Sequence, residues 1–104
     1  MDQRARDRYL VEFPVTFAGD REGTGIVYNL GAGGCKVVTD WPPELGAMLA
    51  VFLKVPGQTF AITVRMATVR WTMEHEFGME FLGFEELERD RLERYLQGLQ
   101  SAAA

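Results

Sequence analysis

The sequence predicts an all-β fold, a six-stranded antiparallel β-barrel followed by a C-terminal α-helix. Apolar and polar residues alternate with a period of two over most of the chain up to residue 83, as in half-buried strands. Four clusters rich in glycine or proline, together with a charged turn at residues 74–76, divide this region into six segments. Beyond residue 84 the apolar spacing changes to three and four, as in an amphipathic helix. The 104 residues suffice for one compact domain, which we place at residues 9–100 behind a flexible arginine-rich arm at residues 1–8.

The six predicted strands differ in how clearly their inward faces can be assigned. The first has odd-numbered residues inward, and its Pro14 lacks an N–H, which favours a sheet edge or a bulge. An exposed edge there would allow a homodimer. The second is expected to point Ile26, Tyr28 and Leu30 inward, with Val27 and Asn29 outward. The expected strands span residues 9–18, 24–30, 35–39, 48–55, 59–73 and 77–81.

The long fifth strand changes parity, which predicts a bulge or a barrel corner. Its inward set is expected to switch from Phe60, Ile62, Val64 and Met66 to Ala67, Val69 and Trp71. The helix is predicted over residues 85–99, with Glu85, Glu86 and Glu88 at its positive end and with Glu85–Arg89 and Asp90–Arg94 as i,i+4 pairs.

The composition argues against several classes of function. Eleven basic and fifteen acidic side chains give a net charge of −4, which disfavours binding to a nucleic-acid polymer. No apolar run approaches the roughly 20 residues that span a bilayer, so we expect no membrane insertion. The N-terminus has no apolar leader and the chain has a single cysteine, so we expect a cytoplasmic location.

Few residues are available for catalysis or metal binding. The lone serine, Ser101, lies in the terminal tail, which excludes a serine triad within the fold. One cysteine and one histidine fall short of the roughly four ligands of structural zinc. Cys35 is expected to be a buried apolar residue, with a Cys35–His75 dyad as the alternative. Glu74, His75 and Glu76 predict a charged turn, with a metal cluster as the alternative. We therefore expect no catalytic residue, metal or cofactor.

Two short segments have no evident role in the core. Arg4 and Arg8 flank the first segment, just before the first strand, and their guanidinium groups suit a phosphate or the acceptor edge of guanine. A solvated arm is the alternative interpretation. The second segment runs from Asn29 to Gly34, where the glycines allow close approach of a ligand and can form an anion-binding concavity. A hairpin with glycines at positive φ is the alternative.

Together the two segments resemble the PilZ domain family. Its cyclic di-GMP receptors carry an R-x-x-x-R motif before the first strand, which Arg4 and Arg8 match, and a [D/N]-x-S-x-x-G motif after the second, whose ends Asn29 and Gly34 match. The resemblance covers nearly the whole chain and implies a receptor without catalytic activity, with a ligand-binding set of Arg4, Arg8, Asn29, Gly31 and Gly34. It also implies an effector protein as partner, because any output is expected to pass to another protein or through self-association.

One position departs from the family pattern, since Gly31 stands where the motif has serine. Without that hydroxyl we expect weaker binding, and a Gly31→Ser substitution is expected to strengthen it. A degenerate PilZ domain that binds only proteins is the main alternative, and a small enzyme acting on an anionic substrate is a third. Trp71 is expected in the core, with guanine stacking as its alternative. Trp41 is expected to be exposed, where it either contacts a ligand or partner or has no special role.

Overall fold

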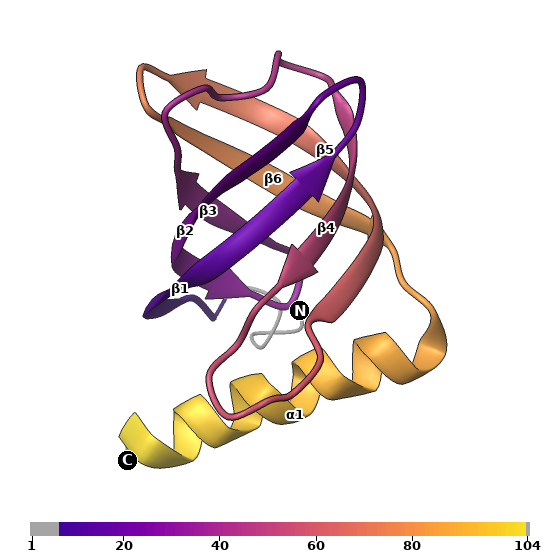
Figure 1. Ribbon diagram of the computed structural model, residues 1–104. Coiled ribbons are helices and arrows are strands. Elements are labelled where there is room, and N and C mark those ends of the chain that lie inside the picture. Colours follow the sequence, from indigo (N-terminus) through magenta and orange to yellow (C-terminus); the bar gives the residue numbers. More distant parts are fainter. Residues whose placement is uncertain (1–6, 104) are drawn as a thin grey trace.

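Six antiparallel strands close into a barrel in this protein, as the sequence predicts. The computed structural model describes residues 7–103. The strands follow one another around the barrel in the order β1-β2-β3-β6-β5-β4, and α1 lies across one end (Figure 1). The elements are β1 (Tyr9–Ala18), β2 (Glu22–Gly31), β3 (Gly34–Val38), β4 (Met48–Leu53), β5 (Ile62–Met73), β6 (Glu76–Gly83) and α1 (Glu86–Ala103).

Pro14 does not lie on an open sheet edge, so this expectation is wrong. β1 lies between β2 and β4, and its pairing with β4 begins at Val15. The Pro14 carbonyl accepts a hydrogen bond of 3.0 Å from the Lys54 N–H, just beyond the end of β4. The N and C=O of a strand residue point the same way, so the proline nitrogen also faces the place where β4 has ended. The register of β1 on β2 shifts between Leu10 and Phe13, which confirms the predicted irregularity near the proline.

Aliphatic and aromatic side chains fill the barrel. Phe17 from β1 and Phe77 from β6 meet edge to face in the interior, with ring centroids 5.2 Å apart. Phe13, Val15 and Phe17 of β1 and the predicted inward residues of β6 are buried, which confirms these assignments. The odd residues at the start of β1, Tyr9 and Val11, are partly buried against the same core. The largest fully buried side chains within residues 7–103 are Val15, Val27, Leu30, Cys35, Val37, Val51, Leu53, Ile62, Val64, Val69, Phe77 and Leu92.

A bulge changes the inward face of β2. Val27 is fully buried and Ile26 is 41% exposed, the reverse of the predicted assignment. Pairing of β2 with β3 shifts register between Val27 and Asn29, so that Tyr28 is the extra residue and Leu30 returns to the interior as expected. Because the shift precedes Asn29, the bulge also sets the direction of the Asn29 side chain. Tyr28 donates a 2.5 Å hydrogen bond to Glu76 on the barrel surface.

The predicted change of parity in β5 is confirmed. Register shifts occur between Met66 and Ala67 and between Val69 and Trp71. Met66 is exposed, so the inward assignment of this residue is wrong. Trp71 is half-buried and lies over Gly78, whose neighbours Phe77 and Met79 point inward. The indole therefore covers bare backbone on the outer face instead of filling the core.

The residues just before β5, Phe60 and Ala61, lie beside α1 and do not pair with a neighbouring strand. β5 begins at Ile62, and Phe60, which was predicted to be inward, is 76% exposed. Arg91 of α1 donates to the carbonyls of Phe60 (2.5 Å) and Ala61 (3.1 Å), which a continued strand would have used in its ladder. The β4–β5 connection consequently descends along the helix (Figure 1).

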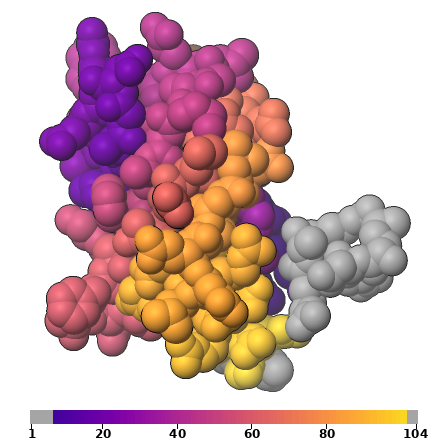
Figure 2. Space-filling view, turned by 90° about the vertical axis from the view of Figure 1, so that its right-hand side faces the viewer, coloured from indigo at the N-terminus to yellow at the C-terminus, as the bar shows by residue number. Residues whose placement is uncertain are grey.

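Helix α1 closes the lower end of the barrel and covers the lower part of the face in Figure 2. Leu92 and Leu96 are buried, and Tyr95 meets Phe13 edge to face at 6.1 Å. The helix ends at Ala103, four residues beyond the predicted end. Within α1, the structure pairs Glu88 with Arg91 at 3.1 Å.

Glu88 joins the helix to β5. Its Oε1 accepts a 2.7 Å hydrogen bond from the Thr63 N–H and further hydrogen bonds from Arg91. Partial burial by itself would raise the pKa of this carboxyl. The Thr63 and Arg91 contacts outweigh it and hold the pKa of Glu88 below the ordinary value of 4.5.

We expect Glu88→Gln to destabilise the protein at pH 7 by about 1 kcal/mol, or about 4–8 °C in melting temperature. The native pKa lies below the unfolded one, so the stabilisation is fully present above the unfolded value and is lost as the pH falls through the native value. Thermal unfolding should show the variant and wild type converging in acid. Asp90→Asn, an exposed position on the same helix, is the control. A stability difference independent of pH would contradict this account.

The tight turn between β2 and β3 requires glycine at position 34, because β6 leaves no room for a side chain there. Gly31 pairs with Gly34 across Ala32 and Gly33. The glycines at positive φ within residues 7–103 are Gly46 and Gly57, so positive φ does not explain this turn. Gly34 is buried against β6, and a Cβ added there would overlap the Met79 carbonyl oxygen. The turn is joined to β6 again where the Phe81 N–H donates to the Gly33 carbonyl at 2.8 Å.

Alanine substitutions at Gly33 and Gly34 should differ in their effect on stability. Gly34→Ala is expected to cost about 1–3 kcal/mol, because backbone on both sides of the new methyl group would have to separate. Gly33→Ala places its methyl group in open space and should change stability by less than about 0.5 kcal/mol. Urea unfolding of both variants measures the difference, and equal stabilities would show that β3 can move away from β6 at little cost.

Candidate functional site

The structure brings Arg8, Asn29 and Gly34 together at the lower end of the barrel. Arg8 immediately precedes β1, Asn29 lies near the end of β2, and Gly34 opens β3. The Arg8 Nε donates to the Asn29 Oδ1 at 2.8 Å, and its Nη1 donates to the Gly34 carbonyl at 3.2 Å. These contacts join residues that are 21 and 26 positions apart in the chain. The guanidinium group therefore lies across the β2–β3 turn.

Gly31 leaves the space that the arginine occupies. A Cβ added at Gly31 would lie 2.9 Å from the Arg8 Nη1 and 2.9 Å from the Asp7 carbonyl oxygen. Both distances are shorter than ordinary van der Waals contact, so a side chain here must displace the segment that enters β1. Four of the five predicted site residues are thus neighbours. The fifth, Arg4, lies outside the residues that the structure describes.

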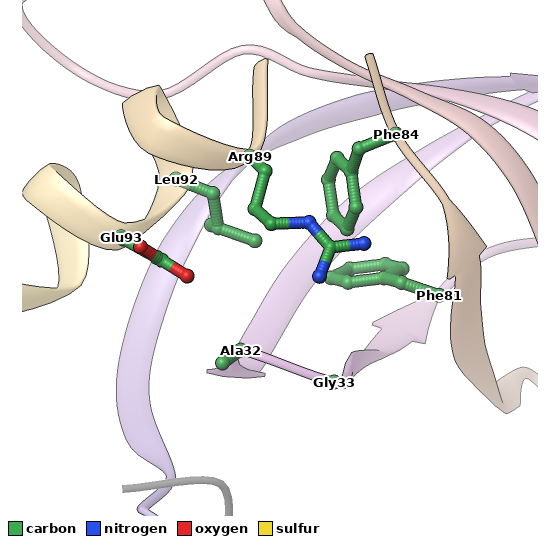
Figure 3. A pocket seen from close by; sticks show the side chains of 7 residues that line it. All are labelled: Ala32, Gly33, Phe81, Phe84, Arg89, Leu92 and Glu93. Carbon is green, nitrogen blue, oxygen red and sulfur yellow. The ribbon is translucent and has the colours of Figure 1, made fainter. Parts of the chain in front are cut away.

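A pocket of about 210 Å³ adjoins the same turn (Figure 3). The turn contributes Ala32 and Gly33 to one side. The remaining lining residues come from the end of β6, the following connection and α1, and they are Phe81, Phe84, Arg89, Leu92 and Glu93. The sequence predicted Arg89 only as part of a helical ion pair and indicated no role for Glu93. Their i,i+4 spacing was visible, but their position above the turn depends on how α1 packs.

Cys35 and His75 are at opposite ends of the β3–β6 pair. Cys35 is paired with Met79, whereas the His75 carbonyl is bonded to Thr39 beyond the other end of β3. His75 and Met79, the partner of Cys35, are four residues apart along the chain, which corresponds to about 13 Å in a strand. Cys35 is fully buried, and burial raises the pKa of its thiol to about 12, only partly opposed by the charge of Arg8. The neutral thiol behaves as the small apolar residue that the sequence predicted.

The remaining candidates lie on the surface. Glu74 and His75 form the exposed β5–β6 turn, and within residues 7–103 no three His, Cys, Asp or Glu side chains gather as metal ligands would. Trp41 is 86% exposed, as expected. The one helix in the described part of the chain lacks the apolar length needed to cross a bilayer.

Comparison with known proteins is consistent with this geometry. The Bacillus subtilis inhibitor of motility (MotI/DgrA) superposes with a TM-score of 0.76 at 20% identity, over 91% of this chain and 50% of that one. The chain thus spans about half the length of that relative. The PilZ domain of CeSA from a cellulose-synthesizing bacterium gives a TM-score of 0.73 at 18% identity, over 90% of this chain and 98% of that one. No curated protein matches in sequence.

The sequence itself assigns the family. The family model of the PilZ domain matches residues 2–98, which is nearly the whole chain and includes both motif segments. The barrel and the helix across its end are the fold shared with the two solved structures. The chain therefore belongs to the PilZ domain family.

Proposed function

We propose that this protein is a cyclic di-GMP receptor that transmits the level of the nucleotide to a partner protein. PilZ domains are receptor and adaptor domains for this second messenger, and the chain belongs to the family. The observation that carries the proposal is the Arg8 guanidinium, bonded at once to Asn29 and to the Gly34 carbonyl. The ligand site comprises Arg4, Arg8, Asn29, Gly31 and Gly34.

The chemistry of Arg8 suits a doubly charged dinucleotide. Its contacts with Asn29 and Gly34 use only part of the donor set of a guanidinium group, and a phosphate accepts from the same planar group in bidentate fashion. Since Asn29 and Gly34 already hold the side chain, less conformational entropy is lost when ligand binds. The net charge of −4 has little effect on the binding of an anionic ligand, because charges beyond about 8–10 Å are screened at physiological salt.

Binding at the β2–β3 turn offers a route to an output. Arg8 leads directly into β1, so a ligand bound to its guanidinium group changes the surface at this end of the barrel. A partner protein that docks on this surface reads the change. We place this signalling in the cytoplasm, where the buried Cys35 remains a thiol.

A second candidate function is a PilZ domain that no longer binds nucleotide and acts only through proteins. Gly31 favours it, because the motif serine is missing. The contact between Arg8 and its own turn also favours it, since a ligand must compete for those donors. Cyclic di-GMP binding by the wild type decides between the two functions, and Arg8 variants test where the ligand binds.

We expect Arg8→Ala to weaken cyclic di-GMP binding by about 100-fold or more, because at least two hydrogen bonds to charged groups are lost. Isothermal titration calorimetry of the wild type and variant measures the effect. Arg21→Ala removes the same charge from the exposed β1–β2 turn at the other end of β1, and it should bind like wild type. Unchanged affinity in Arg8→Ala would place the ligand elsewhere, and a wild type that does not bind would favour the protein-only function.

The crowding at Gly31 revises what a serine there should do. The sequence alone predicts a gain in affinity for Gly31→Ser, but the new Cβ would press on Arg8 and on the Asp7 carbonyl. We now expect Gly31→Ser to bind cyclic di-GMP no more tightly than wild type. Gly31→Ala should bind more weakly than either, because it adds the crowding without the hydroxyl. Tighter binding by the serine variant in the same titration would show that Arg8 moves aside readily.

A further inference from the structure

The pocket beside the β2–β3 turn presents a cation and a carboxylate against aromatic walls. Arg89 lies over the Phe84 ring, 5.4 Å from its centroid, and Phe84 meets Phe81 edge to face at 5.7 Å. Glu93 follows Arg89 by one helical turn and therefore shares its face of α1. Figure 3 shows both side chains reaching over Ala32 and Gly33. In the described part of the chain, no hydrogen bond or ion pair joins Arg89 to Glu93.

The size and lining of this pocket suit a single planar base. Its 210 Å³ is less than the roughly 300 Å³ at which pockets for drug-sized ligands begin, so it has room for a fragment and not for a whole dinucleotide. The Phe81 and Phe84 rings provide apolar aromatic surface against which a base can pack.

The two charges select among the bases. Guanine carries its acceptors, O6 and N7, on the edge that arginine reads. Its N1–H and exocyclic amino group are adjacent donors, and both can donate hydrogen bonds to one carboxylate. Adenine has a donor where guanine has O6, and so it would turn an amino group towards the arginine. An arginine on one side and a glutamate on the other therefore favour guanine.

We propose that this pocket holds one guanine base of the cyclic dinucleotide, with Arg89 donating to its O6 and N7 and Glu93 accepting from its N1–H and exocyclic amino group. The inference rests on the proposed function and adds a base-reading subsite on the helix to it. The subsite and Arg8 share one turn, since Gly33 lines the pocket and the Gly34 carbonyl holds the Arg8 Nη1. A ligand can thus place a phosphate at Arg8 and a base under the helix.

Titration calorimetry on the full chain tests this assignment. Arg89→Ala and Glu93→Ala should each weaken cyclic di-GMP binding by about tenfold, as expected for loss of a bidentate base contact. Arg94→Ala and Asp90→Ala make the same charge changes at exposed positions of α1 outside the pocket and should stay within about twofold of wild type. Alanine favours helix at all four positions, and thermal unfolding verifies that each variant is folded.

The hypoxanthine analogue, cyclic di-IMP, separates base reading from a general loss of affinity because it lacks the exocyclic amino group. Wild type and Arg89→Ala should both prefer cyclic di-GMP to this analogue, whereas Glu93→Ala should show a smaller preference, because the amino group of the guanine in the pocket has lost its acceptor. If Glu93→Ala keeps the wild-type preference, or if both pocket variants bind like wild type, the subsite is refuted while the receptor function still stands on Arg8. If wild type binds neither nucleotide, both proposals fail.

Discussion

The close contact between Gly34 and the Met79 carbonyl of β6 determines the geometry of this end of the barrel. It allows β3 to pair with β6 immediately after the turn, so the turn is tight and its carbonyls lie at the barrel rim. One of these carbonyls accepts from Arg8, and the next one back along the chain accepts from the Phe81 N–H. A side chain at position 34 would separate the strands and move both partners. The turn acts as a rigid platform because it is pinned to β6, although its composition is that of a flexible loop.

Helix α1 contributes to the same end in two ways. Its apolar face, with Leu92 and Leu96, seals the barrel, and Glu88 and Arg91 fasten it to the segment that leads into β5. Apolar packing against the barrel and hydrogen bonds to the segment before β5 therefore both fix the position of the helix. This fixed position is what puts Arg89 above the β2–β3 turn, where its guanidinium lies over the ring of Phe84. The proposed phosphate and base sites would then belong to one continuous surface built from three distant parts of the chain.

Local patterns predicted the strands well and their faces less well. The alternation in β1 and β6 located their inward residues, because from Phe13 to Phe17 and from Phe77 to Phe81 alternate side chains point into the core. In β2 the bulge at Tyr28 exchanged the roles of Ile26 and Val27, and both are β-branched and apolar, so hydropathy could not distinguish them. Phe60 was misplaced for a related reason. Its backbone carbonyl bonds to Arg91, a partner 31 residues away that no local pattern reveals.

By itself the sequence determined the class of fold, the family and the arginine and glycine segments, because these depend on residue type and spacing along the chain. Tertiary structure alone decided which side chains meet. It placed Arg8 in the space left by Gly31, buried Cys35 far from His75, and brought Arg89 and Glu93 over the turn. The physical reason is that each of these contacts depends on strand register and helix packing, which are set by the fit of many side chains in the core.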